Sequence, residues 1–338
     1  MNILITGVHG FVGSNLVKYL SKENTIYGLD IVQPEKEGVK CTFSWDALDA
    51  EGALPEIDAI IHLAGKAHDT RNKSAADVYF KVNTGLTKKI FDWYQASATA
   101  KKFIFFSTAK AAAECVPEIL LENVIPAPKG PYGESKIQAE EYILDALERQ
   151  GVSRVSMSSI VPPSTSLGTR VLPKHGKEVY IFRPCMIHGP GNKGNLNLLY
   201  GVVSKGIPWP LGAFENRRTF TSVGNICFAV NGVLTKDVPS GIYNMGDDDA
   251  LSTNELIEVI CETLGKKVHI WRIPKGFMNG VAKVGGWLHL PLNLLRMQKL
   301  TENYVSSNAK IKKVLGIEKM PVDARKGLKQ TIACFAKK

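Results

Sequence analysis

A short apolar run followed by three glycines opens this chain and constrains its fold more than any other feature. The run covers residues 2–6, and the glycines follow at three-residue intervals: Gly7, Gly10 and Gly13. Apolar residues then recur at helical spacing from residue 11 to residue 20. A strand that enters a helix through glycines lets backbone N–H groups approach a pyrophosphate at the positive end of the helix. The segment therefore predicts a dinucleotide site, with Phe11 and Val12 beside the glycines at the cofactor.

An acidic residue ends the next predicted strand. Residues 25–30 read TIYGLD, and Asp30 lies 20 residues after Gly10. A carboxylate there can accept hydrogen bonds from a ribose 2′-OH and would repel a 2′-phosphate. We therefore expect NAD rather than NADP as the cofactor.

Composition favours a cytoplasmic enzyme. The 338 residues include 42 Lys and Arg against 32 Asp and Glu, a net charge of +10 that suits an anionic substrate such as a nucleotide diphosphate. No basic run is interleaved with aromatic residues, so a nucleic-acid partner is not expected. The six cysteines form no CxxC pair, which indicates reduced thiols rather than disulfides or a metal site. We expect no signal peptide and no membrane span, because the first strand begins at residue 2 and no apolar run reaches about 18 residues.

Strands and helices alternate through the first half of the chain, which is typical of an α/β fold with a Rossmann-type, doubly wound parallel sheet. The expected strands cover 2–6, 25–30, 58–62, 102–107 and 178–183. The expected helices cover 11–21, 75–97, 132–149, 253–264 and 276–290.

The alternation fades after residue 184, which predicts two parts. Residues 1–184 would form the NAD-binding domain and 185–338 a smaller C-terminal α/β substrate lobe, with 219–231 returning to the first domain. Residues 151–176 are rich in Ser, Pro and Gly and fit neither helical nor strand spacing. We interpret them as an irregular surface insertion in preference to a lid over the substrate.

A tyrosine and a lysine four residues apart lie in the segment PYGESKIQAEEYI. On a helix, Tyr132 and Lys136 would share a face. A free phenol, with a pKa of about 10, is a poor base at neutral pH, but a nearby cation lowers its pKa. The pair predicts that Lys136 makes Tyr132 a usable proton acceptor or donor.

Several motifs in order resemble one family over nearly the whole chain: TGVHGFVG (6–13), HLAG (62–65), VNTGLT (82–87), FFST (105–108), PYGESK (131–136), FRPCMIHGPG (182–191), RRTFTSVGN (217–225) and YVSSNAKIKKVLG (304–316). The chain resembles an extended short-chain dehydrogenase/reductase, in the branch of NAD-dependent nucleotide-sugar epimerases and dehydratases that contains the UDP-glucose 4-epimerases. It departs from the family pattern at His188, where Tyr is usual, and at Asn225, which replaces Asp. We expect His188 to pack or hydrogen-bond rather than to catalyse.

The resemblance implies roles for individual residues. Tyr132 would be the acid/base, Lys136 would hold the nicotinamide ribose, and the hydroxyl of Thr108 would bind the reacting sugar oxygen. The remaining cofactor contacts would come from small, polar or charged residues near the strand ends: Asp46 at the adenine, then Leu63, Ala64, Gly65, Asn83, Ser107 and Arg183. The substrate contacts, besides Thr108, would be Lys110, Asn192 and Arg218, with Arg218 on the diphosphate. The resemblance also implies a homodimer.

Three functions follow from these motifs. The first is a C4 epimerase of a UDP-hexose that works through a transient 4-keto intermediate with recycled NAD. The second is an NAD(P)H-dependent reductase of a 4-keto-6-deoxy nucleotide sugar, or of a lipid-linked sugar, in surface-polysaccharide synthesis. The third is a binding protein that has lost its chemistry, which retention of Thr108, Tyr132 and Lys136 disfavours. A 4,6-dehydratase is not expected, because Ala109 and Lys110 stand where that class carries Asp and Glu.

One further segment has the composition of a membrane-surface helix. Residues 275–299 are apolar with basic residues at both ends and could lie on an anionic bilayer. Their glycines and proline, and their expected position in the substrate lobe, favour a buried helical pair instead.

Overall fold

The structure is a computed structural model that describes residues 1–67, 75–159, 176–192, 194–287 and 294–336. Most of the predicted insertion at 151–176 and the end of the predicted helix 276–290 lie outside the described residues. In the described part of the chain, no helix is long and apolar enough to cross a bilayer.

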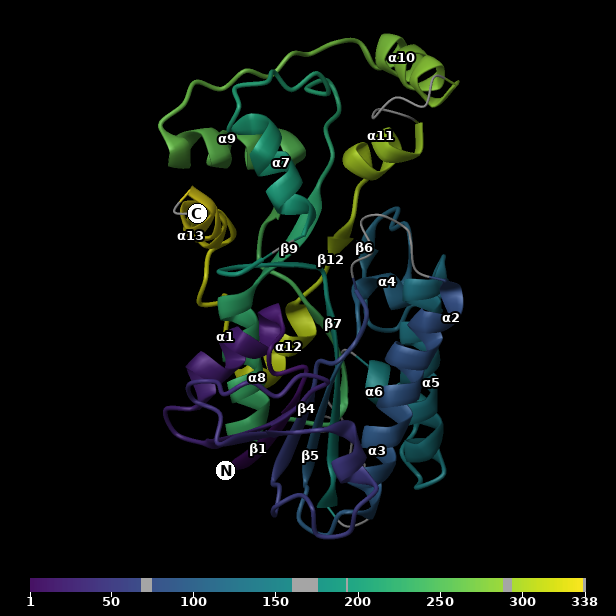
Figure 1. The fold of residues 1–338 in the computed structure, drawn as a ribbon. Helices are drawn as coiled ribbons and strands as arrows, with labels where there is room; N and C mark the ends of the chain where they lie inside the picture. Colours follow the sequence, from purple (N-terminus) through teal and green to yellow (C-terminus); the bar gives the residue numbers. More distant parts are fainter. Residues whose placement is uncertain (68–74, 160–175, 193, 288–293, 337–338) are drawn as a thin grey trace.

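A seven-stranded sheet forms the base of the molecule (Figure 1). Every pairing in it is parallel, in the order β10-β7-β5-β4-β1-β2-β3. Its strands are β1 (Asn2–Thr6), β2 (Thr25–Leu29), β3 (Cys41–Phe43), β4 (Ala59–His62), β5 (Lys102–Phe106), β7 (Glu178–Pro184) and β10 (Gly241–Met245). The doubly wound parallel sheet predicted from the sequence is confirmed.

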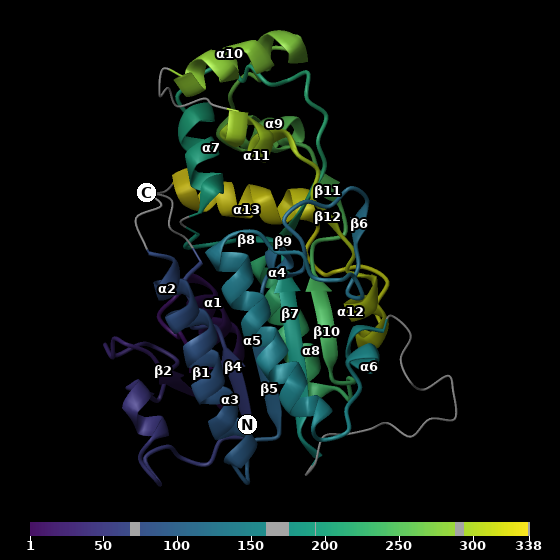
Figure 2. The same cartoon turned by 90° about the vertical axis from the view of Figure 1, so that its right-hand side faces the viewer.

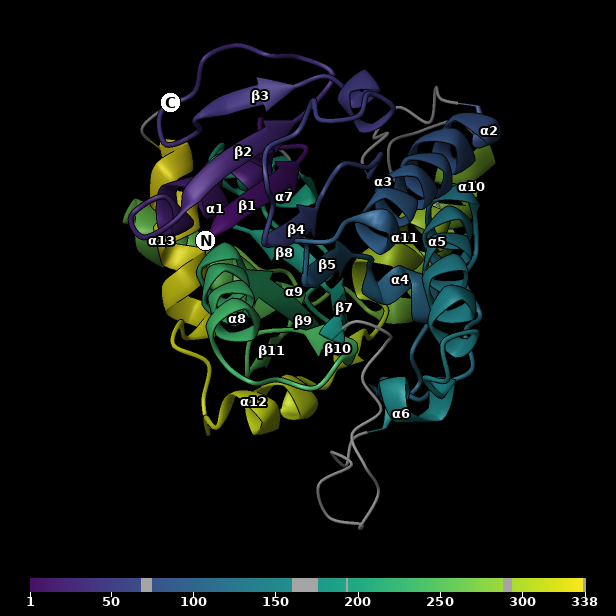
Figure 3. The ribbon, with the colours of Figure 1, turned by 90° about the horizontal axis from the view of Figure 1, so that it is seen from below.

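Helices cover both faces of this sheet (Figure 3). One face carries α1 (Phe11–Leu20), α8 (Val223–Thr235) and α12 (Ala309–Leu315), whose buried aliphatic side chains join one core cluster. The other face carries α3 (Leu86–Ala96) and α5 (Pro131–Glu148), which close a second cluster rich in Phe and Tyr. Because both faces are buried, the inner strands read as continuous apolar runs, as parallel sheets do.

The smaller part of the molecule stands beyond the carboxyl ends of the strands (Figure 2). Two small sheets form its base: β8 (Met186–His188), β9 (Arg218–Ser222) and β11 (Ala250–Leu251) in one, and β6 (Ile119–Leu120) and β12 (Val305–Ser306) in the other. Its helices are α7 (Asn195–Val203), α9 (Thr253–Leu264), α10 (Lys275–Trp287), α11 (Leu294–Thr301) and α13 (Ala324–Ala336). Short helices elsewhere are a 3₁₀ turn (Trp45–Leu48), α4 (Ala109–Ala112) and α6 (Arg154–Ser158).

One predicted helix and two strands that were not predicted separate the structure from the sequence prediction. The single helix expected at 75–97 is divided into α2 (Ala76–Tyr79), a π-helical turn (Phe80–Gly85) and α3. The wider turn places Asn83 and Thr84 in the buried contact with α5, where both bond Ser135. The central sheet also has two strands that were not expected, β3 and β10.

Strand β10 lies far along the chain, at residues 241–245, and pairs with β7 at the edge of the sheet. The division of the chain into domains at residue 184 stays a prediction. Three later elements, α8, β10 and α12, belong to the central sheet and its cover.

Candidate active site

A cavity of about 570 Å³ opens between the carboxyl ends of the central strands and the smaller part of the molecule. In an open parallel sheet this crevice is where ligands bind. It gathers fourteen of the residues predicted from the sequence: Gly7, Gly10, Phe11, Val12, Gly13, Leu63, Gly65, Ser107, Thr108, Lys110, Tyr132, Lys136, Asn192 and Arg218.

The glycine-rich turn between β1 and α1 forms one wall of the cavity. Gly7 has a φ of 67°, in the region that favours glycine, and its carbonyl accepts the N–H of Gly10 at 2.9 Å. A Cβ added at Gly13 would lie 2.5 Å from the carbonyl oxygen of Gly7. No side chain caps the N-terminus of α1, and its first turn carries no acidic residue. The arrangement leaves backbone N–H groups directed to the cavity, as an anion-binding helix end requires.

The neighbouring strand ends are fixed by a buried polar pair. The hydroxyl of Thr6 accepts the N–H groups of Leu63 and Ala64 at 3.1 and 3.0 Å. It also bonds Nδ1 of His62 at 2.7 Å, and Nε2 of that ring bonds Thr87 at 2.9 Å. These contacts position the Leu63–Gly65 backbone against the glycine turn.

Tyr132 and Thr108 meet at the centre of the cavity. Thr108 follows β5 and is the N-cap of α4, while Tyr132 is in the first turn of α5. Burial raises the pKa of Tyr132, and hydrogen bonding by the Thr108 hydroxyl opposes part of that increase. The ring of Tyr79 lies against that of Tyr132, edge to face, with centroids 6.5 Å apart.

Lys136 lies deeper than Tyr132, with 4% of its surface exposed. Its Nζ donates to the carbonyl of Phe106 at 2.8 Å and lies 4.9 Å from the ring centroid of Phe105. Burial lowers the pKa of Lys136 to about 8, although the nearby Glu140 carboxylate raises it.

The expectation that Lys136 lowers the pKa of Tyr132 is wrong in this structure. Burial is the largest influence and raises the pKa of Tyr132 above its ordinary value, and Tyr79 adds to the increase. Thr108, not Lys136, supplies the opposing effect, because the ammonium is directed to the end of β5 rather than to the phenol.

Charged side chains gather at the end of the cavity away from the glycine turn. Arg218, on β9, donates to Glu302 at 3.3 Å, and Nζ of Lys110 lies 3.8 Å from the same carboxylate oxygen. Lys110 also pairs with Glu114 at 3.3 Å and lies over the ring of Tyr304. The two predicted substrate-binding cations therefore share one carboxylate.

Five predicted site residues do not line the cavity. Asp30 lies just past β2 and accepts the N–H of His9 at 3.2 Å, which connects it to the glycine turn. Ala64 is held by Thr6, as described above. Asp46 is exposed on the 3₁₀ turn. Asn83, expected at the cofactor, exchanges hydrogen bonds with the backbone of Lys66 at 2.7 and 3.1 Å.

Arg183, predicted to contact the cofactor, is 2% exposed and forms a buried ion pair instead. Its guanidinium bonds both carboxylate oxygens of Glu140, the shortest contact being 2.5 Å. Glu140 also accepts the hydroxyl of Ser107. The ion pair thus supports the backbone beside Thr108 from behind the cavity.

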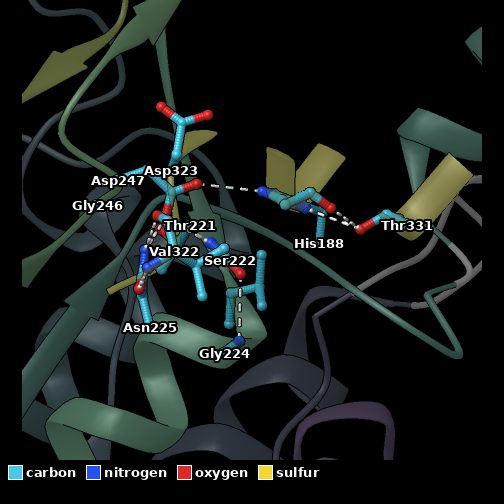
Figure 4. Close-up of polar contacts among 12 residues, drawn as sticks. His188, Thr221, Ser222, Gly224, Asn225, Gly246, Asp247, Val322, Asp323 and Thr331 are labelled. Atoms are coloured by element: carbon cyan, nitrogen blue, oxygen red, sulfur yellow. Dashed lines mark hydrogen bonds and ion pairs between the residues drawn. The ribbon is translucent and has the colours of Figure 1, made fainter. Parts of the chain in front are cut away.

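The two family departures have structural explanations (Figure 4). His188 is buried and bonds Thr331 at 3.0 Å and Asp247 at 3.2 Å, without lining the cavity. The amide of Asn225 donates to Asp247 at 2.7 Å and to the carbonyl of Val322 at 2.8 Å. It also accepts the N–H of Val322 at 2.9 Å. An aspartate at position 225 would oppose the carboxylate of Asp247.

Sequence reasoning missed Glu114, Cys185, Glu302 and Tyr304, which also line the cavity. Tyr304 reaches it because its backbone pairs with β9: it donates to Arg217 at 2.8 Å and accepts from Thr219 at 2.9 Å. This pairing also brings Glu302 to Arg218. Tyr304 begins the motif YVSSNAKIKKVLG, so it could have been proposed, whereas no motif marks Glu302.

Known proteins resemble this chain over nearly its whole length. A UDP-glucose 4-epimerase from Vibrio cholerae is 29% identical, covering 99% of this chain and 95% of that protein. An N-acetyl-alpha-D-glucosaminyl-diphospho-ditrans,octacis-undecaprenol 4-epimerase from Escherichia coli O157:H7 is 26% identical, covering 92% and 85%. The structure of a UDP-glucuronic acid 4-epimerase from Bacillus cereus, in complex with NAD, shares the fold with a TM-score of 0.71 at 17% identity, covering 100% of this chain and 99% of that one.

A family model described as the NAD dependent epimerase/dehydratase family matches residues 3–246. This match confirms the resemblance stated from the motifs and, at the level of the family, NAD as the cofactor. With its glycine turn, its Thr-Tyr-Lys set and its doubly wound sheet, the chain belongs to the NAD dependent epimerase/dehydratase family.

Proposed function

We propose that this protein is an epimerase that inverts C4 of a UDP-hexose through a transient 4-keto intermediate. The observation that carries the proposal is that Thr108 and Tyr132 line the same cavity as the uncapped glycine turn of α1. A proton-transfer group and a nucleotide cradle thus share one enclosed space. The similarity to 4-epimerases over the whole chain supports the same reaction.

The residues of the cradle fit NAD. The close approach of Gly13 to Gly7 leaves no room for a side chain, so backbone N–H groups can contact a pyrophosphate directly. We propose that Asp30, beside the turn, accepts hydrogen bonds from the hydroxyl groups of the adenosine ribose. When bound, NAD would supply a hydride acceptor beside C4 and, once reduced, a hydride donor.

We propose that Tyr132 takes the proton from the C4 hydroxyl and returns it after the sugar turns. The hydrogen bond from Thr108 stabilises the phenolate and opposes the increase in pKa that burial causes. The hydroxyl of Thr108 has one hydrogen, so it donates either to the phenolate or, once the sugar is bound, to the sugar oxygen on which charge develops. Lys136 fixes the carbonyl end of β5, and hence the position of Thr108 relative to Tyr132.

At the far end of the cavity we propose that Arg218 and Lys110 receive the diphosphate, with Asn192 beside them. Both cations are paired with the single carboxylate of Glu302 in the structure. A bound diphosphate would offer them two phosphate groups as partners in place of that carboxylate. Dehydration remains disfavoured on the residues: Ala109 has no acidic group, and the ammonium of Lys110 is engaged by Glu114 and Glu302.

An assay of the purified protein tests the proposal. It uses UDP-glucose, UDP-N-acetylglucosamine and a 4-keto-6-deoxy derivative, and follows the sugar products and the nicotinamide absorbance together. We expect interconversion of C4 epimers without net consumption of nicotinamide, and no turnover in Tyr132→Phe. Stoichiometric oxidation of NAD(P)H with the keto sugar alone would make the protein a reductase and overturn the proposal.

A further inference from the structure

Exposed apolar side chains gather at the end of the smaller part of the molecule that lies farthest from the central sheet. They are Ile207, Val268, Trp271, Phe277 and Val281, with 51%, 44%, 56%, 65% and 40% of their surfaces exposed. We call this region the outer surface. Helix α10, which carries the last two, forms the extreme end of the molecule in two perpendicular views (Figures 1 and 2). Monomeric proteins rarely leave such a group exposed without a partner.

Two of the segments that carry these residues, 207–212 and 268–271, lie side by side. Trp209 donates to the carbonyl of His269 at 2.8 Å and accepts the N–H of Trp271 at 2.8 Å. Gly212 donates to the carbonyl of Trp271 at 3.0 Å. Trp209 and Ile270 face the apolar core of the lobe, which leaves Val268 and Trp271 directed outward.

Helix α10 continues the outer surface and corrects an expectation from the sequence. Met278 and Ala282 are buried, whereas Phe277 and Val281 are exposed one residue earlier in each case. The described part of the segment 275–299 therefore packs on the lobe with one face and exposes a second apolar face. A fully buried helical pair, as the sequence favoured, would not leave Phe277 65% exposed.

The charged residues in the segments that carry the outer surface are all basic. Residues 195–214 contain no Asp or Glu, and residues 263–301 contain seven Lys and Arg and no Asp or Glu. Along these segments the apolar residues alternate with exposed cations: Lys205, Lys266, Lys267, Arg272, Lys275 and Lys283. Of the three acids of the adjoining helix α9, Glu258 and Glu262 are paired with Arg325 and Lys329, and Glu255 accepts the N–H of Ser252 at the helix start.

We propose that the outer surface docks on an anionic lipid bilayer. Cations interspersed with Trp, Phe and aliphatic side chains are the composition of a segment that lies in a membrane interface. The cations would contact the headgroups and the apolar side chains would enter the boundary below them. A nucleic acid would bind the cations but leave the aliphatic side chains exposed to water. A protein partner would have to place acidic side chains opposite the cations, and nothing in the structure points to such a partner.

Docking would bring the cavity close to the membrane. Helix α7 begins beside Asn192 and Gly194, which line the cavity, and ends two residues before Lys205. Its nine residues rise about 13 Å. The cavity would then lie roughly one short helix from the headgroups, within reach of a sugar diphosphate carried on a lipid. The docking itself does not depend on which sugar is bound.

Flotation with lipid vesicles tests the proposal on the full-length protein. We expect the protein to float with vesicles of phosphatidylglycerol and phosphatidylcholine in equal parts, less so as salt rises, and not with phosphatidylcholine alone. Trp271→Ser with Phe277→Ser, and Lys267→Glu with Arg272→Glu, should each reduce partitioning roughly tenfold. Near-UV circular dichroism identifies any variant that has unfolded.

Matched substitutions elsewhere supply the controls. Ile125→Ser changes an apolar residue that is 91% exposed, and Lys18→Glu with Lys22→Glu changes two exposed cations near α1. Both should float as the unaltered protein does. The proposal is overturned if the protein ignores phosphatidylglycerol vesicles or if the controls lose as much binding as the test variants. Light scattering supplies a second test. If the unaltered protein is an oligomer and the double variant Trp271→Ser with Phe277→Ser is a monomer, the surface is a protein interface and the proposal is overturned.

Discussion

Tyr132 and Lys136 stand about one helical turn apart on α5, yet their functional atoms have different neighbours. The phenol meets Thr108, and the ammonium meets the carbonyl of Phe106. Their spacing could be read from the sequence because it is local. The direction of the lysine could not, because it depends on where β5 ends relative to α5. Burial then determines both pKa values, raising that of Tyr132 and lowering that of Lys136.

The hydroxyl of Thr108 should control the pH at which Tyr132 acts. Thr108→Val removes the hydrogen bond that stabilises the phenolate, so the pKa governing kcat should move upward and activity at neutral pH should fall. The measurement is a pH–rate profile, with Thr108→Ser as the control that keeps the hydroxyl. An unchanged profile in Thr108→Val would remove Thr108 from the proposed chemistry.

Lys136 should make folding stability depend on pH in a defined window. Its pKa is about 8 when folded and about 10.4 when unfolded. Between these values the unfolded chain binds more protons, so Lys136 lets stability rise with pH, by at most about 1.4 kcal/mol per pH unit. Lys136→Met removes this contribution. Urea unfolding should therefore show a smaller increase in the free energy of unfolding from pH 8 to pH 9 than in the unaltered protein. Equal changes in both proteins would contradict the lowered pKa.

Among the elements, β1, the glycine turn and α1 match the sequence prediction because short-range patterns specify them. The π-helical turn at Phe80–Gly85 did not follow from any pattern, since it is selected by the contact of Asn83 and Thr84 with Ser135 across the domain. Strand β10 was missed for a similar reason. Its five residues contain a Gly and an Asn, and only pairing with β7 makes them a strand.

Gly13→Ala should damage the glycine turn. The added Cβ would lie 2.5 Å from the carbonyl oxygen of Gly7, so either the turn or α1 must shift. We expect the free energy of unfolding to fall by about 1–3 kcal/mol and NAD binding to weaken. Calorimetry and titration with NAD measure both effects.

Gly201→Ala in α7 is the matched control for this substitution. Apart from the neighbouring backbone of α7, no described atom lies within 4 Å of its added Cβ, and alanine favours a helix over glycine. This variant should keep NAD binding and gain a little stability. Equal behaviour of the two variants would show that the close packing at Gly13 is not required.

For the whole molecule, contacts between distant segments join the central sheet to the smaller part. The network of Asn225, Asp247 and Val322 connects α8, the segment after β10 and the segment before α13 (Figure 4). The sequence marked Asn225 as a departure from the family pattern but could not explain it. Likewise, the ion pair of Arg183 with Glu140 replaced a predicted cofactor contact, because both side chains are enclosed behind the cavity. Motifs predict which residues gather at a site better than they predict which way each side chain points.

Asn225→Asp should therefore destabilise the protein. The new carboxylate would face Asp247 and could not donate to Val322, at a cost of about 2–3 kcal/mol near neutral pH. Burial and the like charge raise the pKa of the new carboxyl in the folded state, so the destabilisation should shrink as pH falls and the group takes up a proton. Asn231→Asp, on the same helix and only half-buried, is the control. Equal stability of the two variants at neutral pH would contradict this explanation.

The central claim is that hydride leaves C4 and returns to C4 of the same sugar while Tyr132 moves the proton. A UDP-hexose that carries deuterium at C4 tests it most directly, with mass spectrometry of the products in the presence of excess unlabelled NADH. The account predicts that the C4 epimer forms and keeps its deuterium. Loss of deuterium from the epimer, or no epimer from any UDP-hexose, would contradict it.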